Sequence, residues 1–123
     1  MRLGLAAIAA LLAPAAASAQ SMNAETFHQK AIALQRKGMM AVFSKDLKVL
    51  VKEGQAAAEV VSGRRQAVLK AGGKPRYCPL PSSPRKMETK EFMARLGAIP
   101  RADRQRIDMT EAMNRILARK FPC

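Results

Sequence analysis

Hydrophobic positions recur with helical spacing along most of this chain. In the first segment Phe27, Ala31 and Leu34 fall on one face, as in an amphipathic helix. Asn23 is placed to cap this helix, and Gly38 marks its end. The apolar residues at 39–43 are expected to form a short connector of about one helical turn.

The longest helix is predicted at about residues 44–71, with Ser44 as its cap. The positions that follow a 3.6-residue period are Leu47, Leu50, Val51, Gly54, Ala57, Ala58, Val61 and Val68. The small residues from Gly54 to Ala58 predict close packing of another helix, and Gly63 is a candidate kink. Gly72-Gly73, followed by Lys74-Pro75, ends the helix.

A loop rich in Pro and Ser is predicted at residues 72–86, followed by short helices within 87–123. One begins near Thr89, a further turn begins at Pro100, and Asp108 caps the last helix. Its apolar face comprises Met109, Ala112, Met113, Ile116, Leu117 and Phe121. Since no segment alternates as a strand does, the predicted fold is all-α, a small helical bundle of about four to five helices.

Residues 1–19 have the pattern of a signal peptide. Arg2 precedes an apolar run, Pro14 breaks it, and Ala17-Ser18-Ala19 offers a cleavage site before Gln20. The alternative is a permanent membrane anchor, but this run falls short of the about 20 apolar residues that an anchor needs. We therefore expect a periplasmic or secreted protein with one domain at residues 20–123.

The chain has two cysteines, Cys78 and Cys123, both in the exported part. In an oxidising compartment a disulfide is the default, and it would close the segment 87–123 against the loop. Two free thiols are the alternative. Two cysteines and one histidine fall short of the four ligands of a closed zinc site, so no metal and no cofactor is expected.

The formal net charge is +13, and loss of Arg2 with the signal peptide makes it +12. This excess favours acidic partners such as anionic lipid, wall carboxylates or an acidic protein, although a solvated basic surface is an equally simple interpretation. The few aromatic residues and the export signal argue against nucleic acid. Membrane adsorption ranks lower, because the apolar helix faces are expected to be needed for the core.

No catalytic constellation is visible. His28 is the only histidine, is expected on the exposed side of its helix, and has no evident nucleophile or orienting partner. Glycine-rich phosphate loops and paired-cysteine metal motifs are also missing from the sequence, so we expect no enzymatic activity. The methionines at 39, 40, 87, 93, 109 and 113 are interpreted mainly as core fillers, with a soft binding surface as the alternative.

Three pieces of the C-terminal third share one pattern: Cys78-Pro79-Leu80-Pro81, the short helix Glu91–Leu96 before Pro100, and Phe121-Pro122-Cys123. In this pattern the chain resembles the Rap/Tai family of small exported immunity proteins. The resemblance covers residues 77–123, and in that family the second Pro directly follows the first. It implies a helical periplasmic protein with a Cys78–Cys123 disulfide, often dimeric, that blocks a peptidoglycan-cleaving amidase effector of type VI secretion.

The leading functional hypothesis is therefore a non-enzymatic binding protein of the immunity type, with a protein partner and a possible homodimer. The candidate binding surface is the 72–86 loop and the adjoining basic residues: Lys74, Arg76, Tyr77, Arg85, Lys86, Arg101, Arg104 and Arg106. The alternatives are an envelope-stress or chaperone-like binder of acidic clients, and a basic binder of the wall or an anionic membrane surface.

Overall fold

The structure is a computed structural model that describes residues 21–82 and 86–123; the predicted signal peptide lies outside the described residues. Six helices are present in the described part and no strand: α1 (Ala24–Arg36), the 3₁₀ helix η2 (Gly38–Phe43), α2 (Lys45–Lys70), α3 (Thr89–Ala98), α4 (Arg101–Arg104) and α5 (Met109–Lys120). The all-α prediction is confirmed, and the predicted connector at 39–43 is the additional 3₁₀ helix.

The predicted helix starts are confirmed because the capping groups act locally. The side chain of Asn23 accepts hydrogen bonds from the backbone N–H groups of Glu25 and Thr26, that of Ser44 from Asp46, and that of Asp108 from Glu111. Gly38 and Gly72 have φ angles of +58° and +76°, a conformation that glycine adopts without strain, at the ends of α1 and α2.

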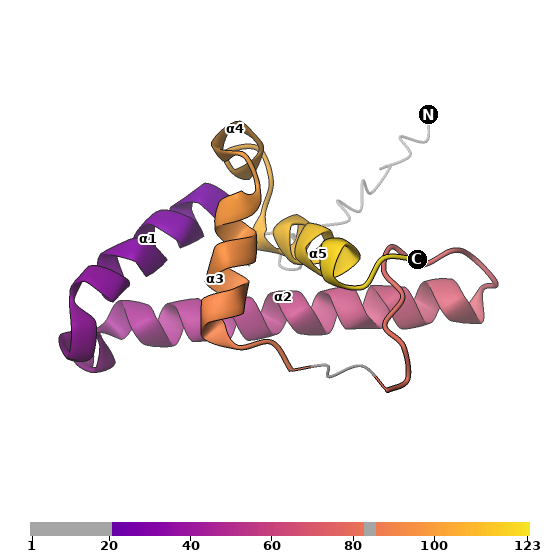
Figure 1. The fold of residues 1–123 in the computed structure, drawn as a ribbon, viewed down its shortest axis with the longest axis horizontal. Coiled ribbons are helices and arrows are strands. Elements are labelled where there is room, and N and C mark those ends of the chain that lie inside the picture. Colours follow the sequence, from indigo (N-terminus) through magenta and orange to yellow (C-terminus); the bar gives the residue numbers. More distant parts are fainter. Residues whose placement is uncertain (1–20, 83–85) are drawn as a thin grey trace, which may run out of the picture.

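Helix α2 is the longest helix, and the other main helices pack along it. In Figure 1 it runs along the whole length, while α1, α3 and α5 lie on one side of it and α4 lies farthest from it. Its contacts are chiefly with α5 and α1. With 26 residues α2 is about 39 Å long, whereas the 12 residues of α5 span about 18 Å, so α5 covers less than half of it.

The starts of α1 and α5 are joined side by side by backbone hydrogen bonds. The N–H of Ala24 donates to the carbonyl of Ile107 at 2.9 Å, and the N–H of Met109 donates to the carbonyl of Met22 at 2.7 Å. The Asn23 amide also donates to the carbonyl of Gln105 at 3.0 Å. This clamp satisfies orphan N–H groups of two helix termini at once.

The core lies where α1, α3 and α5 meet the middle of α2. Its largest fully buried side chains are Leu96, Met109, Ile116 and Val61. Phe27 of α1 and Phe92 of α3 meet edge to face, with ring centroids 5.9 Å apart. The predicted apolar face of α5 is therefore confirmed as core.

The predicted disulfide is confirmed: Cys78 and Cys123 are bonded, with their Cα atoms 4.8 Å apart. Next to it the N–H of Cys78 donates to the carbonyl of Phe121 at 2.8 Å. The bidentate ion pair of Arg76 with Glu111, at 2.6 and 2.8 Å, ties the same loop to α5. The loop after α2 is thus fixed to the end of α5.

The prediction that another helix packs closely on the small residues of α2 holds only in part. No helix packs closely on Gly54, since nothing in the described part lies within 4 Å of a Cβ built there. Helix α2 continues past Gly63 to Lys70, and a kink at Gly63 stays a prediction. The apolar face of α2 is buried only at Leu50, Ala57 and Val61, whereas Val51 is 48% exposed. Of the small residues, Ala57 is in the core, whereas Gly54 and Ala58 line a groove beside α2.

Candidate functional site

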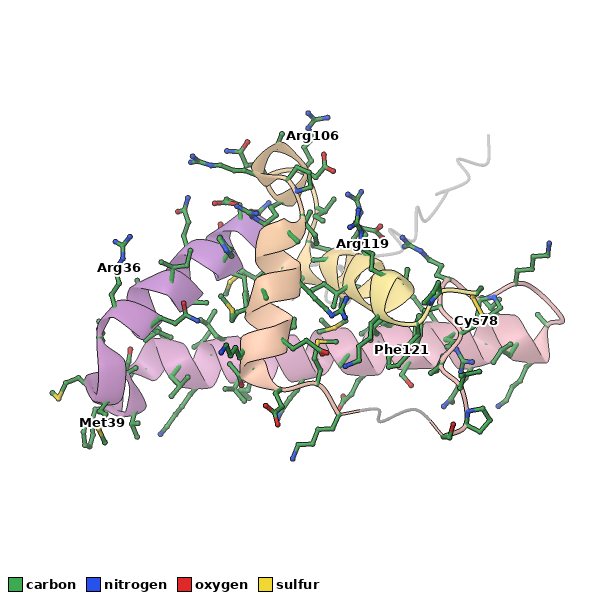
Figure 2. All side chains as sticks on the ribbon, in the orientation of Figure 1. Arg36, Met39, Cys78, Arg106, Arg119 and Phe121 are labelled. Carbon is green, nitrogen blue, oxygen red and sulfur yellow. A yellow bond between two sulfur atoms is a disulfide. The ribbon has the colours of Figure 1, made fainter. Side chains whose placement is uncertain are left out.

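The predicted basic binding surface is not one surface. Lys74, Lys86, Arg101 and Arg106 are exposed, and Arg85 lies outside the described residues. Figure 2 shows Arg106 well apart from Cys78, whose loop carries the other half of the predicted set. The structure therefore does not bring the two halves together.

Two members of the predicted surface are buried, which corrects their assignment. Tyr77 is 7% exposed, because its ring lies beside α2 under the guanidinium of Arg65. Arg104 is also 7% exposed, because its Nε donates to the Glu25 carboxylate at 2.7 Å and its terminal nitrogen donates to the carbonyls of Gly97 and Ile99. Both side chains stabilise the fold from inside.

Several cations of the C-terminal half are neutralised within the molecule. Lys120 contacts the carboxylate of Glu91 at 2.6 Å, and Arg115 bridges Asp103 and Glu111, each at 3.2 Å. The Lys120 ammonium holds the pKa of Glu91 below its usual range, as Arg76 does for the pKa of Glu111. These ion pairs reduce the positive charge that the C-terminal half presents to solvent.

His28 is half-buried, not exposed as predicted. A Cβ added to Gly97 would lie 3.5 Å from its Nε2, so the imidazole is set against the end of α3. Burial, and secondarily the charge of Arg104, lowers the pKa of His28. Among the described residues no group of three or more His, Cys, Asp or Glu side chains is placed to hold a metal ion.

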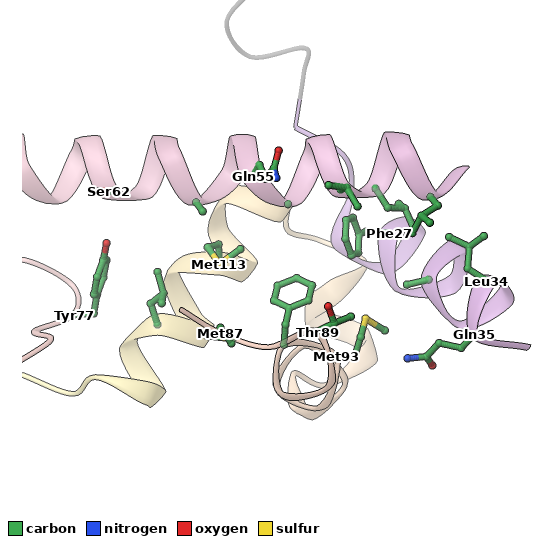
Figure 3. Close-up of a pocket in the computed structure, with 18 of the residues that line it drawn as sticks. Phe27, Leu34, Gln35, Gln55, Ser62, Tyr77, Met87, Thr89, Met93 and Met113 are labelled. Atoms are coloured by element: carbon green, nitrogen blue, oxygen red, sulfur yellow. The ribbon is translucent and has the colours of Figure 1, made fainter. Parts of the chain in front are cut away.

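An apolar groove of 740 Å³ lies between α2 and the other helices. We call it the groove; its main apolar lining residues are Phe27, Ala31, Leu34, Leu47, Leu50, Val51, Ala58, Tyr77, Met87, Phe92, Met93, Met113, Leu117 and Phe121. Figure 3 shows Met113 facing the side chains of α2, with Leu34 and Gln35 towards one end and Tyr77 at the other. On α2 the lining extends from Leu47 to Gln66, about 28 Å of helix.

The Tyr77 end of the groove carries a cation. Arg65 lines the groove, its Nε donates to the carbonyl of Tyr77 at 3.0 Å, and its guanidinium lies 5.4 Å from the centre of the Tyr77 ring. No carboxylate in residues 21–82 and 86–123 lies within ion-pair distance of Arg65. The groove therefore combines a long apolar wall with one positive end.

Sequence reasoning missed the groove and Arg65, although a signal for both exists. The apolar stripe of α2 extends well beyond the length that a 12-residue partner helix covers. Arg65 lies on the same helix face as Ala58, Val61 and Ser62, at i+7, i+4 and i+3. Its position on this face sets Arg65 apart from the other, exposed cations of α2.

None of the helices in the described part is both long enough and apolar enough to span a membrane. Comparisons with protein-family models, with curated proteins and with solved structures each found no match to this chain. The Rap/Tai resemblance therefore stays a prediction, and the function is argued from the geometry.

Proposed function

We propose that this chain is an exported, non-enzymatic binding protein whose ligand lies in the groove. The ligand class that fits is an amphiphile with one long apolar chain and an anionic head group. The observation that carries the proposal is the combination of a 740 Å³ apolar groove with the unneutralised guanidinium of Arg65 at its end. Apolar pockets of about 300–1,000 Å³ with a few polar groups are typical of small-molecule sites.

The length and lining of the groove suit an extended apolar chain. Its lining follows α2 for about 28 Å and is formed mainly by apolar side chains. An acyl chain lying along this wall would remove apolar surface of both the ligand and the protein from water.

The charge at the Tyr77 end selects the head group. Arg65 is only partly exposed, and its Nε is already used by the Tyr77 carbonyl, which leaves the outer guanidinium N–H groups for a ligand. A carboxylate or phosphate there would gain charge-assisted hydrogen bonds. The positive net charge of the chain also favours a ligand with an anionic head group.

Calorimetry with the oxidised mature protein tests the proposal, with hexadecanoate and hexadecanol as probes below their aggregation limits. We expect hexadecanoate to bind more tightly than the alcohol. Arg65→Gln should weaken hexadecanoate binding about tenfold to a hundredfold, since a hydrogen bond to a charged group is worth about 1.5–3 kcal/mol. The control is Arg64→Gln, an exposed neighbour outside the groove.

A second pair of variants tests the location. Ala58 is exposed to the groove, so Ala58→Trp should fill it and lower affinity about tenfold or more without unfolding the helix. Ala56→Trp places the same ring on an exposed position of α2 that does not line the groove. Absence of hexadecanoate binding, or equal effects of the two tryptophans, would contradict the proposal.

The immunity-type function is the second candidate, and a different observation favours it. Residues 72–82 are held by the disulfide at Cys78 and present Leu80, which is 66% exposed. Such a fixed apolar side chain suits insertion into the cleft of a peptidoglycan amidase. Leu80→Asp should then abolish capture and inhibition of one periplasmic hydrolase, while Ala58→Trp leaves both intact. Capture of many acidic proteins that salt releases would instead support a chaperone-like binder.

A further inference from the structure

The end of the molecule between α1 and α2 carries an apolar surface that the fold does not use. Four large side chains of η2 are exposed: Met39 by 89%, Met40 by 67%, Val42 by 67% and Phe43 by 82%. No residue of η2 is buried. Figure 2 shows Met39 at the extreme end of the molecule, pointing away from it. The interpretation of Met39 and Met40 as core fillers is therefore wrong. We call Met39, Met40, Val42 and Phe43 the tip.

Cations surround the tip on both sides. Arg36 and Lys37 precede it at the end of α1, and Lys45 and Lys48 follow it in the first turn of α2; all four are exposed. The sequence from residue 36 to residue 52 contains five basic residues and one acidic residue, Asp46. None of these five cations forms an ion pair within the described residues.

We propose that the tip inserts into the surface of an anionic lipid bilayer. A small apolar knob of Met, Val and Phe enters the boundary between head groups and acyl chains, and the surrounding cations then lie at the depth of the head groups. Long Lys and Arg side chains reach such a layer while their carbon stems stay on apolar surface. Juxtaposed basic residues are attracted by anionic lipid over about one Debye length.

The charge distribution favours a bilayer over a second copy of the chain. Two copies meeting at their tips would bring two sets of these cations together, with one carboxylate each to offset them. A layer of anionic head groups neutralises all of them at once. Helix η2, which carries the tip, is only six residues long and begins at the turn of Gly38, so the tip is a narrow projection and not a broad interface.

The tip and the groove are neighbours, but the proposals rest on different residues. Gly38 and Ala41 of η2 line one end of the groove, beside Leu34 and Leu47. A protein docked by its tip would therefore hold this end of the groove towards the bilayer. Tip insertion requires no ligand in the groove, and a ligand-binding groove requires no membrane.

Vesicle flotation with the oxidised mature protein tests the tip. The probes are vesicles of phosphatidylcholine alone and of phosphatidylcholine with an equal amount of phosphatidylglycerol. We expect binding to the anionic vesicles only, and weaker binding as salt is raised. The double variant Met39→Ser/Phe43→Ser should lower partitioning about tenfold or more without changing the melting temperature, because neither side chain is buried.

Leu69→Ser/Leu80→Ser is the matched control, since it removes two exposed apolar side chains away from the tip and should leave vesicle binding unchanged. Ala58→Trp should also leave it unchanged, which separates this test from that of the groove. The proposal is overturned if the tip variant floats like the parent protein, if neutral vesicles bind equally well, or if sedimentation shows that the tip variant merely breaks a dimer.

Discussion

At the scale of single residues, the most consequential contact is the buried pair of Glu25 and Arg104. Their side chains are 10% and 9% exposed, and the Nε–Oε2 distance is 2.7 Å. Gln29 donates a hydrogen bond to the other carboxylate oxygen of Glu25 at 3.3 Å. Arg104 also donates hydrogen bonds to the carbonyls of Gly97 and Ile99. One guanidinium thereby joins α1 to the end of α3 and to α4.

Arg104→Met should be strongly destabilising, because it leaves the Glu25 carboxylate and two carbonyls buried without this donor. Removing one partner of a buried ion pair costs about 3–5 kcal/mol of the free energy of unfolding. Arg106→Met, two positions away and exposed, should change it by less than about 0.5 kcal/mol. Urea denaturation of both variants measures the difference, and equal midpoints would refute a structural role for Arg104.

Acidification should destabilise the protein in two stages. Arg104 lowers the pKa of Glu25, Lys120 that of Glu91 and Arg76 that of Glu111, so the unfolded state binds protons more readily than the folded state. The stability that these carboxylates contribute is present above about pH 4.3 and is lost as the pH falls through their folded pKa values. Burial likewise lowers the pKa of His28, which makes stability start to fall below about pH 6.5.

Denaturation midpoints measured across this pH range check both stages. His28→Gln should remove the first decline and leave the second, whereas Glu25→Gln should weaken the second. A midpoint that stays constant down to pH 4 would show that the pKa of His28 is the same in the folded and the unfolded protein.

At the scale of elements, the sequence predicted where helices begin and end, since a cap such as Asn23 or Asp108 acts within one turn. Which face of a helix is covered depends on residues far along the chain, and the predictions of which side chains are buried are wrong at several positions. Val51 and Ala58 follow the apolar period but line an open groove. Arg104 was expected on the surface, because nothing near it in sequence reveals Glu25, 79 positions earlier.

The two glycines of α2 differ in their relation to the groove. A Cβ at Gly54 or Gly63 meets nothing within 4 Å in the described part, so each Gly→Ala change should stabilise the helix by about 1 kcal/mol. Gly54 lines the groove and Gly63 does not. Thermal melts should therefore show similar gains for both variants, with hexadecanoate affinity lowered only in Gly54→Ala. A destabilised Gly63→Ala variant would indicate that the helix is packed or bent there.

At the scale of the whole molecule, helix α5 is held at both of its ends. Near the start of α1 the clamp of backbone hydrogen bonds joins the N-termini of α1 and α5. At the other end the disulfide fixes Cys123, just after α5, to the loop that returns from α2. Met113 and Leu117 of α5 line the groove between these attachments, and its cationic end lies beside Tyr77, next to Cys78. The disulfide therefore supports the site as well as the fold.

Replacing both cysteines by serine should consequently lower stability and affinity together. The bond closes a separation of 45 residues, for which chain entropy gives about 4 kcal/mol, enough to lower the melting temperature by roughly 15 °C or more. At temperatures where the variant is still folded, the disulfide no longer holds residue 78 beside Tyr77 and Arg65. Hexadecanoate binding should therefore weaken, while vesicle binding through the tip persists. Calorimetry and flotation on the Cys78→Ser/Cys123→Ser variant measure the two effects separately, with reduced parent protein as the control. If affinity is unchanged at full folding, the Arg76–Glu111 ion pair and the Cys78–Phe121 backbone bond suffice to hold the groove end in place.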